Sequence, residues 1–147
     1  MNISEKKRAI IYTATIGYLL LTLFFLLYNF SLSPEKVPNT LLGIPTDMIA
    51  HFVIFIPIPF IIEIFLKWHS IRFSFWGLFT ISMCVGITYG SLTEGLQTLL
   101  ITGRKGNIYD LLADSLGTLS GFILNIFIGT TIEKWLLKIT KYGKYER

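Results

Sequence analysis

YGSLTEGLQTLLITGRKGNIYDLLADSLGTLSG, residues 89–121, is the stretch around which the chain is organised, because ionisable side chains interrupt an otherwise apolar sequence there. Its polar side chains include Glu94, Gln97, Arg104, Lys105, Asp110 and Asp114. Hydrocarbon accommodates ionisable groups only where they are paired, reach the interface or line a wet cavity. The stretch therefore predicts two helix ends joined by a short turn, carrying either a functional site or a structural polar cluster.

The composition places this stretch inside an integral membrane protein. Hydrophobic residues make up 52% of the 147 residues and charged residues only 15%, against roughly 25% charged residues in typical soluble domains. The apolar residues are pooled into runs long enough for the roughly 20 residues of a membrane-spanning helix. We therefore expect one membrane domain over residues 1–147.

The runs predict an all-α bundle of four transmembrane helices, at approximately residues 9–30, 47–66, 75–100 and 108–132. Pro57 and Pro59 should kink or break the second helix, because proline lacks the N–H that an interior helical hydrogen bond needs. A Pro- and Gly-containing loop over residues 30–46 precedes that helix, and Thr46 or Asp47 is expected to cap its start.

The distribution of basic residues predicts the topology. Of the thirteen Lys and Arg residues, three precede Ala9, two lie within residues 67–72 and five follow Ile132. Basic residues concentrate in cytoplasmic loops, so both termini should be cytoplasmic. Because the Lys and Arg residues flank apolar runs instead of forming one polar face, nucleic acid is not an expected partner.

This topology brings the polar residues of three helices to one depth. Asp47 and His51 start the second helix, Glu94 and Gln97 close the third, and Asp110 and Asp114 start the fourth. The i,i+4 and i,i+3 spacings place each pair on one helix face. The other halves of these helices are expected to carry no intramembrane polar group, so the sequence predicts one outward-facing acidic site.

Small residues share these faces. Gly90 lies one turn before Glu94, and Gly117 and Gly121 continue the face of Asp110 and Asp114. A small-xxx-small pattern lets a neighbouring helix backbone approach closely. The three glycines are therefore interpreted as helix-packing positions.

Over residues 47–121 these elements together resemble the VanZ-like family of small bacterial membrane proteins. The residues that carry the resemblance are Asp47-x-x-x-His51-Phe52, Tyr89-Gly90-x-x-x-Glu94-x-x-Gln97, Arg104 and Asp110-x-x-x-Asp114-x-x-Gly117-x-x-x-Gly121. The family usually has Asn where this chain has Asp114. The resemblance implies a multi-pass protein of the bacterial cytoplasmic membrane, with a cell-envelope role linked to resistance to the glycopeptide antibiotic teicoplanin.

One hypothesis is a binding or catalytic site for an anionic lipid head group or a lipid-linked envelope precursor. Candidate catalytic residues are Asp47, His51, Glu94 and Asp110, which could instead hold a divalent cation through carboxylate oxygens and an imidazole nitrogen. Candidate ligand-binding residues are Tyr89, Gln97, Arg104, Lys105 and Asp114. In this reading Arg104 and Lys105 would hold the phosphate.

The alternative hypothesis is a non-enzymatic protein, either a small oligomeric transporter or a membrane partner of another envelope protein. In that case the polar residues relay ions or fix the bundle, as interhelical hydrogen bonds do in membranes. No standard catalytic signature such as GxSxG, HExxH or a P-loop occurs in the sequence. The residues therefore predict a site but leave open whether it catalyses a reaction.

Overall fold

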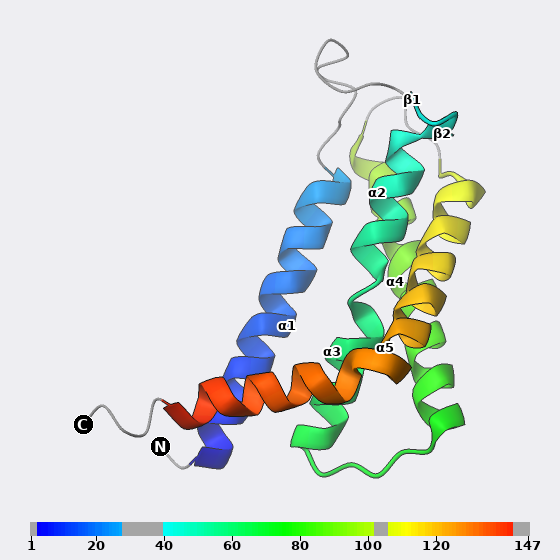
Figure 1. The fold of residues 1–147 in the computed structure, drawn as a ribbon. Coiled ribbons are helices and arrows are strands. Elements are labelled where there is room, and N and C mark those ends of the chain that lie inside the picture. The colour runs from blue at the N-terminus through cyan, green and yellow to red at the C-terminus, as the bar shows by residue number, and fades with distance from the viewer. Residues whose placement is uncertain (1–2, 28–39, 102–105, 143–147) are drawn as a thin grey trace.

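The computed structural model describes residues 3–27, 40–101 and 106–142 and shows an all-α protein, as predicted (Figure 1). Its helices are α1 (Ile3–Leu27), α2 (Thr46–Phe55), α3 (Ile58–Trp68), α4 (Phe75–Leu100) and α5 (Ile108–Tyr142). The only strands in the described residues are β1 (Thr40–Leu41) and β2 (Ile44–Pro45), which form a short antiparallel hairpin before α2.

Three helical segments are long and apolar enough to cross a membrane: Thr46–Trp68, Phe75–Leu100 and Ile108–Ile132. The apolar part of α1, Ala9–Phe25, is shorter. The described residues thus show three of the four predicted spans at full length. The predicted first span, residues 9–30, continues past Leu27 into residues that the structure does not describe, and its described part contains the shorter apolar helix.

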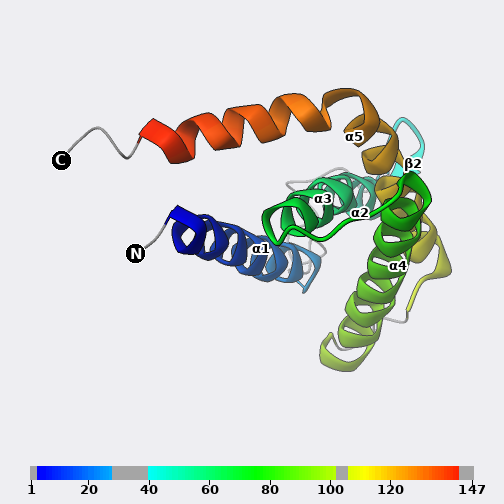
Figure 2. The same ribbon diagram turned by 90° about the horizontal axis from the view of Figure 1, so that it is seen from below.

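The helices pack around α5. The first half of α5 packs against α2, α3 and α4, whereas α1 packs against α3 and α4 from the side. The second half of α5 bends away from the bundle, toward the end where α1 begins (Figures 1 and 2). At the opposite end lie the start of α2, the end of α4 and the start of α5 (Figure 1). These three helix ends carry the polar residues.

The second span is interrupted where its prolines predict. α2 ends at Phe55 and α3 begins at Ile58, with Pro57 at the N-cap of α3 and Pro59 in its first turn. Pro57 and Pro59 have no N–H to donate back to α2, so the hydrogen-bond ladder cannot continue through them. The two helices nevertheless remain one span, Thr46–Trp68.

The start of α2 differs from the prediction. Pro45 is the N-cap residue and makes no side-chain capping hydrogen bond, while Thr46 is already helical. The cause is the hairpin, in which Pro45 pairs with Thr40, so that the chain enters α2 directly from a strand. Asp47 lies in the first turn, where a negative charge interacts favourably with the positive N-terminal end of the helix dipole.

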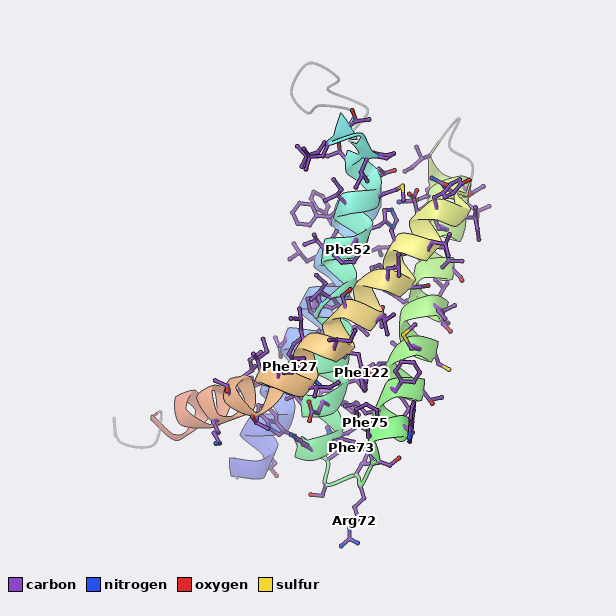
Figure 3. All side chains as sticks on the ribbon, turned by 45° about the vertical axis from the view of Figure 1, so that its right-hand side comes forward. Phe52, Arg72, Phe73, Phe75, Phe122 and Phe127 are labelled. Carbon is purple, nitrogen blue, oxygen red and sulfur yellow. The ribbon has the colours of Figure 1, made fainter. Side chains whose placement is uncertain are left out.

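An aromatic cluster closes the other end of the bundle. The ring of Phe122 in α5 lies 5.2 Å from the rings of both Phe75 and Phe79 in α4. Phe73, Phe75 and Phe122 gather where α4 and α5 meet, while Arg72 points out of the loop before α4 (Figure 3). Edge-on aromatic pairs at this distance stabilise packing, so these rings stabilise the end of the bundle away from the polar residues.

Candidate functional site

Six side chains from three helices form what we call the polar site. They are Asp47 and His51 of α2, Glu94 and Gln97 of α4, and Asp110 and Asp114 of α5. His51 and Asp114 are 0% exposed, Asp110 and Gln97 1% and Glu94 8%, while Asp47 is half-buried. Buried ionisable groups in such number are rare in proteins, so the polar site is the most unusual chemical feature of the described residues.

His51 connects the carboxylates of two other helices. Its Nδ1 lies 2.9 Å from Oδ1 of Asp114, and its Nε2 lies 3.7 Å from Oε1 of Glu94. When Asp114 is ionised its carboxylate can only accept hydrogen bonds, so Nδ1 carries the ring proton and donates a hydrogen bond to Asp114. The Nε2 contact is too long for a hydrogen bond, so this nitrogen faces Glu94 without being bonded to it.

Glu94 is anchored at its second oxygen. Its Oε2 accepts a 2.8 Å hydrogen bond from the backbone N–H of Asn107, just before α5. The Asn107 side chain in turn accepts from the N–H of Tyr109 at 3.0 Å, which is the bond of a helix N-cap. Asn107 was not among the predicted site residues, although an Asn directly before an apolar helix is itself a capping signal.

The same region provides an arrangement suited to a cation. One ring nitrogen of His51 and one carboxylate oxygen each of Asp47 and Asp110 all lie within 4.8 Å of one another. Glu94, which was the fourth predicted metal-ligating residue, is not part of this group but faces the Nε2 of His51. Carboxylate oxygens with an imidazole nitrogen are a common ligand set for divalent metals.

Three predicted glycines lie at close helix contacts. A Cβ at Gly117 would overlap the backbone carbonyl oxygen of Phe52, and one at Gly121 would overlap that of Ile56. A Cβ at Gly90 would lie 2.6 Å from Oδ2 of Asp114. The glycines thus let α5 approach α2 and α4 closely, and this approach brings the polar side chains together.

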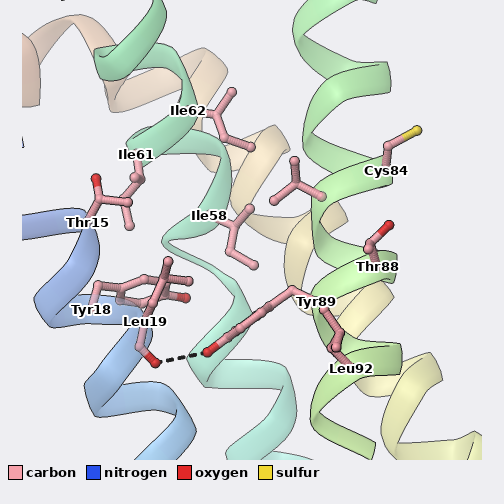
Figure 4. Close-up of a pocket in the computed structure, with 11 residues that line it drawn as sticks. Thr15, Tyr18, Leu19, Ile58, Ile61, Ile62, Cys84, Thr88, Tyr89 and Leu92 are labelled. Carbon is pink, nitrogen blue, oxygen red and sulfur yellow. Dashed lines mark hydrogen bonds between the residues drawn. The ribbon is translucent and has the colours of Figure 1, made fainter. Parts of the chain in front are cut away.

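Tyr89, predicted as a ligand-binding residue, is directed toward α1 instead of the polar site. Its hydroxyl donates to the carbonyl oxygen of Leu19 at 3.0 Å (Figure 4) and lies 2.6 Å from Oγ1 of Thr22. Its ring packs against Phe55 at a centroid distance of 5.7 Å. Arg104 and Lys105, the predicted phosphate-binding residues, lie outside the described residues.

An apolar pocket of about 420 Å³ lies between α1, α3 and α4. We call it the apolar pocket; it is lined by Thr15, Tyr18, Leu19, Ile58, Ile61, Ile62, Cys84, Val85, Thr88, Tyr89 and Leu92 (Figure 4). Tyr89 lines it, and the next residue, Gly90, faces Asp114. The apolar pocket and the polar site therefore lie against different faces of the same part of α4, a relationship that the sequence did not reveal.

A second, half-buried polar contact lies in the other half of the bundle. Glu63 of α3 pairs with Lys67 at 2.8 Å and also accepts a 2.5 Å hydrogen bond from the side-chain amide of Asn125 in α5. The expectation that these halves carry no intramembrane polar group is therefore wrong. The signal was present in the sequence, because Asn125 continues the face of Gly117 and Gly121 at four-residue spacing.

No protein-family model, curated protein or solved structure matches this chain. The molecule itself supports a coarser description. Three long apolar helices indicate a multi-pass membrane protein, and the helix ends that meet between them hold a buried His/Asp/Glu cluster. An imidazole oriented by one carboxylate and facing another can bind a polar ligand, hold a cation or transfer a proton.

Proposed function

We propose that this chain is a VanZ-like membrane protein of the bacterial cell envelope whose polar site binds the head group of an anionic lipid or lipid-linked precursor. The observation that carries the proposal is the fully buried pair of His51 and Asp114, with Glu94 on the far side of the imidazole. Ionisable side chains within membrane-spanning helices are costly and therefore rare, and where they occur they commonly mark a functional site. In this proposal the bound molecule contributes to glycopeptide resistance, of which teicoplanin resistance is the example.

The apolar pocket supports a lipid as the ligand. Its lining surface is almost entirely apolar, although Thr15, Tyr18, Thr88 and Tyr89 are among its residues. A pocket of about 420 Å³ between helices falls in the size range of ligand pockets in proteins. Because the neighbouring residues Tyr89 and Gly90 of α4 face the apolar pocket and the polar site, a single amphipathic molecule bound at α4 would place its chain in the apolar pocket and its head group at the polar site.

The distribution of basic residues supports an extracytoplasmic position for the polar site. The polar site lies at the bundle end opposite the start of α1 (Figure 1). Most basic residues belong to segments at the other end, before Ala9, within residues 67–72 and after Ile132. By the positive-inside rule the polar site faces the extracytoplasmic side. A lipid-linked envelope precursor exposes its head group on that side of the cytoplasmic membrane.

Native mass spectrometry of the purified full-length protein tests the lipid. Wild-type protein incubated with phosphatidylglycerol should retain it, because both its charged head group and its acyl chain find a site. Thr88→Trp should abolish retention, since an indole would fill the apolar pocket. Ser91→Trp is the matched control, because Ser91 is exposed on the same helix and does not line the pocket. Equal retention by both variants would sink the proposal.

A susceptibility assay tests the cellular role. A bacterial strain expressing the wild-type chain should grow at higher teicoplanin concentrations than one expressing Glu94→Gln, which removes a charge from the polar site. Glu63→Gln removes a half-buried carboxylate from the other half of the bundle and should behave as wild type. If Glu94→Gln reaches the membrane and protects as well as wild type, the polar site has no part in resistance and is structural, as the alternative hypothesis holds.

A further inference from the structure

The polar site concentrates negative charge. Four of its six side chains are carboxylates (Asp47, Glu94, Asp110 and Asp114), and one is an imidazole. Carboxylate oxygens and an imidazole nitrogen from three helices are donor types that divalent first-row metal ions take.

His51 offers a ligand atom that the protein leaves unused. Its Nδ1 is bonded to Asp114, so the lone pair of the neutral imidazole is on Nε2. This side chain is 0% exposed, and within the described part of the chain its Nε2 has no hydrogen-bond partner. A metal-bound histidine almost always donates its other ring N–H to a carboxylate or carbonyl, which is the relation of His51 to Asp114.

Two carboxylates lie close to the imidazole of His51. One ring nitrogen of His51 and one carboxylate oxygen each of Asp47 and Asp110 lie within 4.8 Å of one another, and because Nδ1 is bonded to Asp114, Nε2 is the nitrogen left to take an ion. Around an ion with bonds of 2.0–2.2 Å, neighbouring ligand atoms lie about 3–3.5 Å apart. Binding of an ion would therefore draw these ligand atoms closer together.

We propose that the polar site binds one divalent metal ion through Nε2 of His51 and the carboxylates of Asp47 and Asp110. Asp114 is the positioning residue, which fixes the ring of His51, and Glu94 faces the ion from α4. This inference rests on the proposed function for its role: the ion bridges the acidic protein and the anionic head group, as Mg²⁺ bridges carboxylates and substrate phosphates.

The donor set selects the class of ion. Calcium takes six to eight oxygen ligands, and magnesium is usually held by one or two carboxylates and water. An imidazole nitrogen beside two carboxylates instead favours first-row transition ions. Mn²⁺ and Zn²⁺ are therefore the expected ions, with Mg²⁺ binding more weakly.

Electron paramagnetic resonance of Mn²⁺ added to purified, delipidated full-length protein tests the site without any lipid. Wild type should bind one Mn²⁺ per chain, displaced by Zn²⁺, with pulsed measurements showing coupling to an imidazole nitrogen. His51→Gln and Asp110→Asn should each weaken Mn²⁺ affinity more than about tenfold, and His51→Gln should also remove the nitrogen coupling. Glu63→Gln is the control and should bind Mn²⁺ as wild type does.

Two outcomes would overturn the metal site: wild-type protein that unfolds cooperatively but binds no Mn²⁺ or Zn²⁺, or His51→Gln protein with unchanged affinity. Should a variant fail to fold, the melting temperature of wild type decides instead, because Zn²⁺ must raise it if the folded state binds the ion. If the protein retains phosphatidylglycerol equally before and after chelation, the ion does not bridge protein and lipid, and the proposed lipid function still stands. If the protein binds Mn²⁺ but retains no lipid, the metal site stands and the proposed lipid function is refuted.

Discussion

Gly117 of α5 lies against the backbone carbonyl oxygen of Phe52 in α2, the residue that follows His51. Four residues further along both helices, Gly121 meets the carbonyl oxygen of Ile56 in the same way. The two contacts fix the register of α5 on α2. Asp114, three residues before Gly117, is thereby brought to 2.9 Å from His51, so the glycines determine the geometry of the polar site.

Gly117→Ala should destabilise the bundle. The added methyl group would overlap the Phe52 carbonyl oxygen and lie 3.1 Å from Cβ of Phe55, and backbone atoms cannot move aside as a flexible side chain would. Overpacking of this kind costs about 1–3 kcal/mol. Gly95→Ala is the control, because nothing lies within 4 Å of its added Cβ. Thermal unfolding in detergent measures both, and equal melting temperatures would contradict the close contact.

The helical pattern of this chain was predictable because it depends on local properties. The apolar runs and the prolines at 57 and 59 are read directly from the sequence, and they correspond to the Thr46–Trp68 span and its interruption. The extent of α5 was harder to predict. No glycine or proline separates Gly129 from Gly143, so the helix continues beyond the apolar run to Tyr142.

The convergence of the polar site followed from topology, but its contacts did not. Equal depth in three helices suggested that Asp47, His51 and Glu94 share one region, and the i,i+4 spacing placed Asp47 on the same helix face as His51. In the structure Asp114 holds that ring. Which carboxylate reaches the imidazole depends on how α5 is rotated and how closely it approaches α2, and both depend on packing between residues far apart in the sequence.

Asp114→Asn should be tolerated, whereas Asp114→Ala should not. The amide oxygen of Asn can still accept from Nδ1 of His51, and a side chain of the same size still fits against Gly90. Alanine would leave the buried imidazole N–H unsatisfied, which costs about 1–3 kcal/mol. Denaturant unfolding of both variants in the same detergent gives the difference. If Ala and Asn variants lose equal stability, the His51–Asp114 bond is not what holds the ring.

Glu94→Ala should expose the backbone N–H of Asn107 to exchange. The carboxylate accepts from this N–H at 2.8 Å, and hydrogen bonds to charged groups contribute about 1.5–3 kcal/mol. Exchange at Asn107 should therefore accelerate about tenfold to a hundredfold, with Glu94→Gln giving a smaller effect because its oxygen can still accept. Hydrogen–deuterium exchange resolved to this amide provides the measurement.

The N–H of Gly77 is an internal reference for that experiment. It donates to Oγ of Ser74 at 3.0 Å at the opposite end of α4, so its exchange should not respond to Glu94. If Gly77 and Asn107 accelerate together, the variant has loosened the whole fold, and a specific bond from Glu94 is refuted. Acceleration at Asn107 alone identifies Glu94 as the group that ties the end of α4 to the start of α5.

Glu63 provides a comparison between two partners of one carboxylate. Asn125 donates to Oε2 from α5, and its Oδ1 is buried, whereas the Lys67 side chain is 28% exposed. Interhelical hydrogen bonds in membrane proteins contribute about 0.6–2 kcal/mol, against about 0.3–0.5 kcal/mol for an exposed i,i+4 ion pair. Double-mutant cycles with alanine at each position should therefore give Glu63 a larger coupling energy with Asn125 than with Lys67.

Which of the two coupling energies is larger decides the role of Glu63. Both cycles share the Glu63→Ala variant, so any general effect of losing that carboxylate cancels between them. A larger coupling to Asn125 means that Glu63 joins α3 to α5 inside the bundle and stabilises the half opposite the polar site. A larger coupling to Lys67 would instead make Glu63 an interfacial residue. The close fit of Gly129 beside Glu63 and Asn125 would then need another cause.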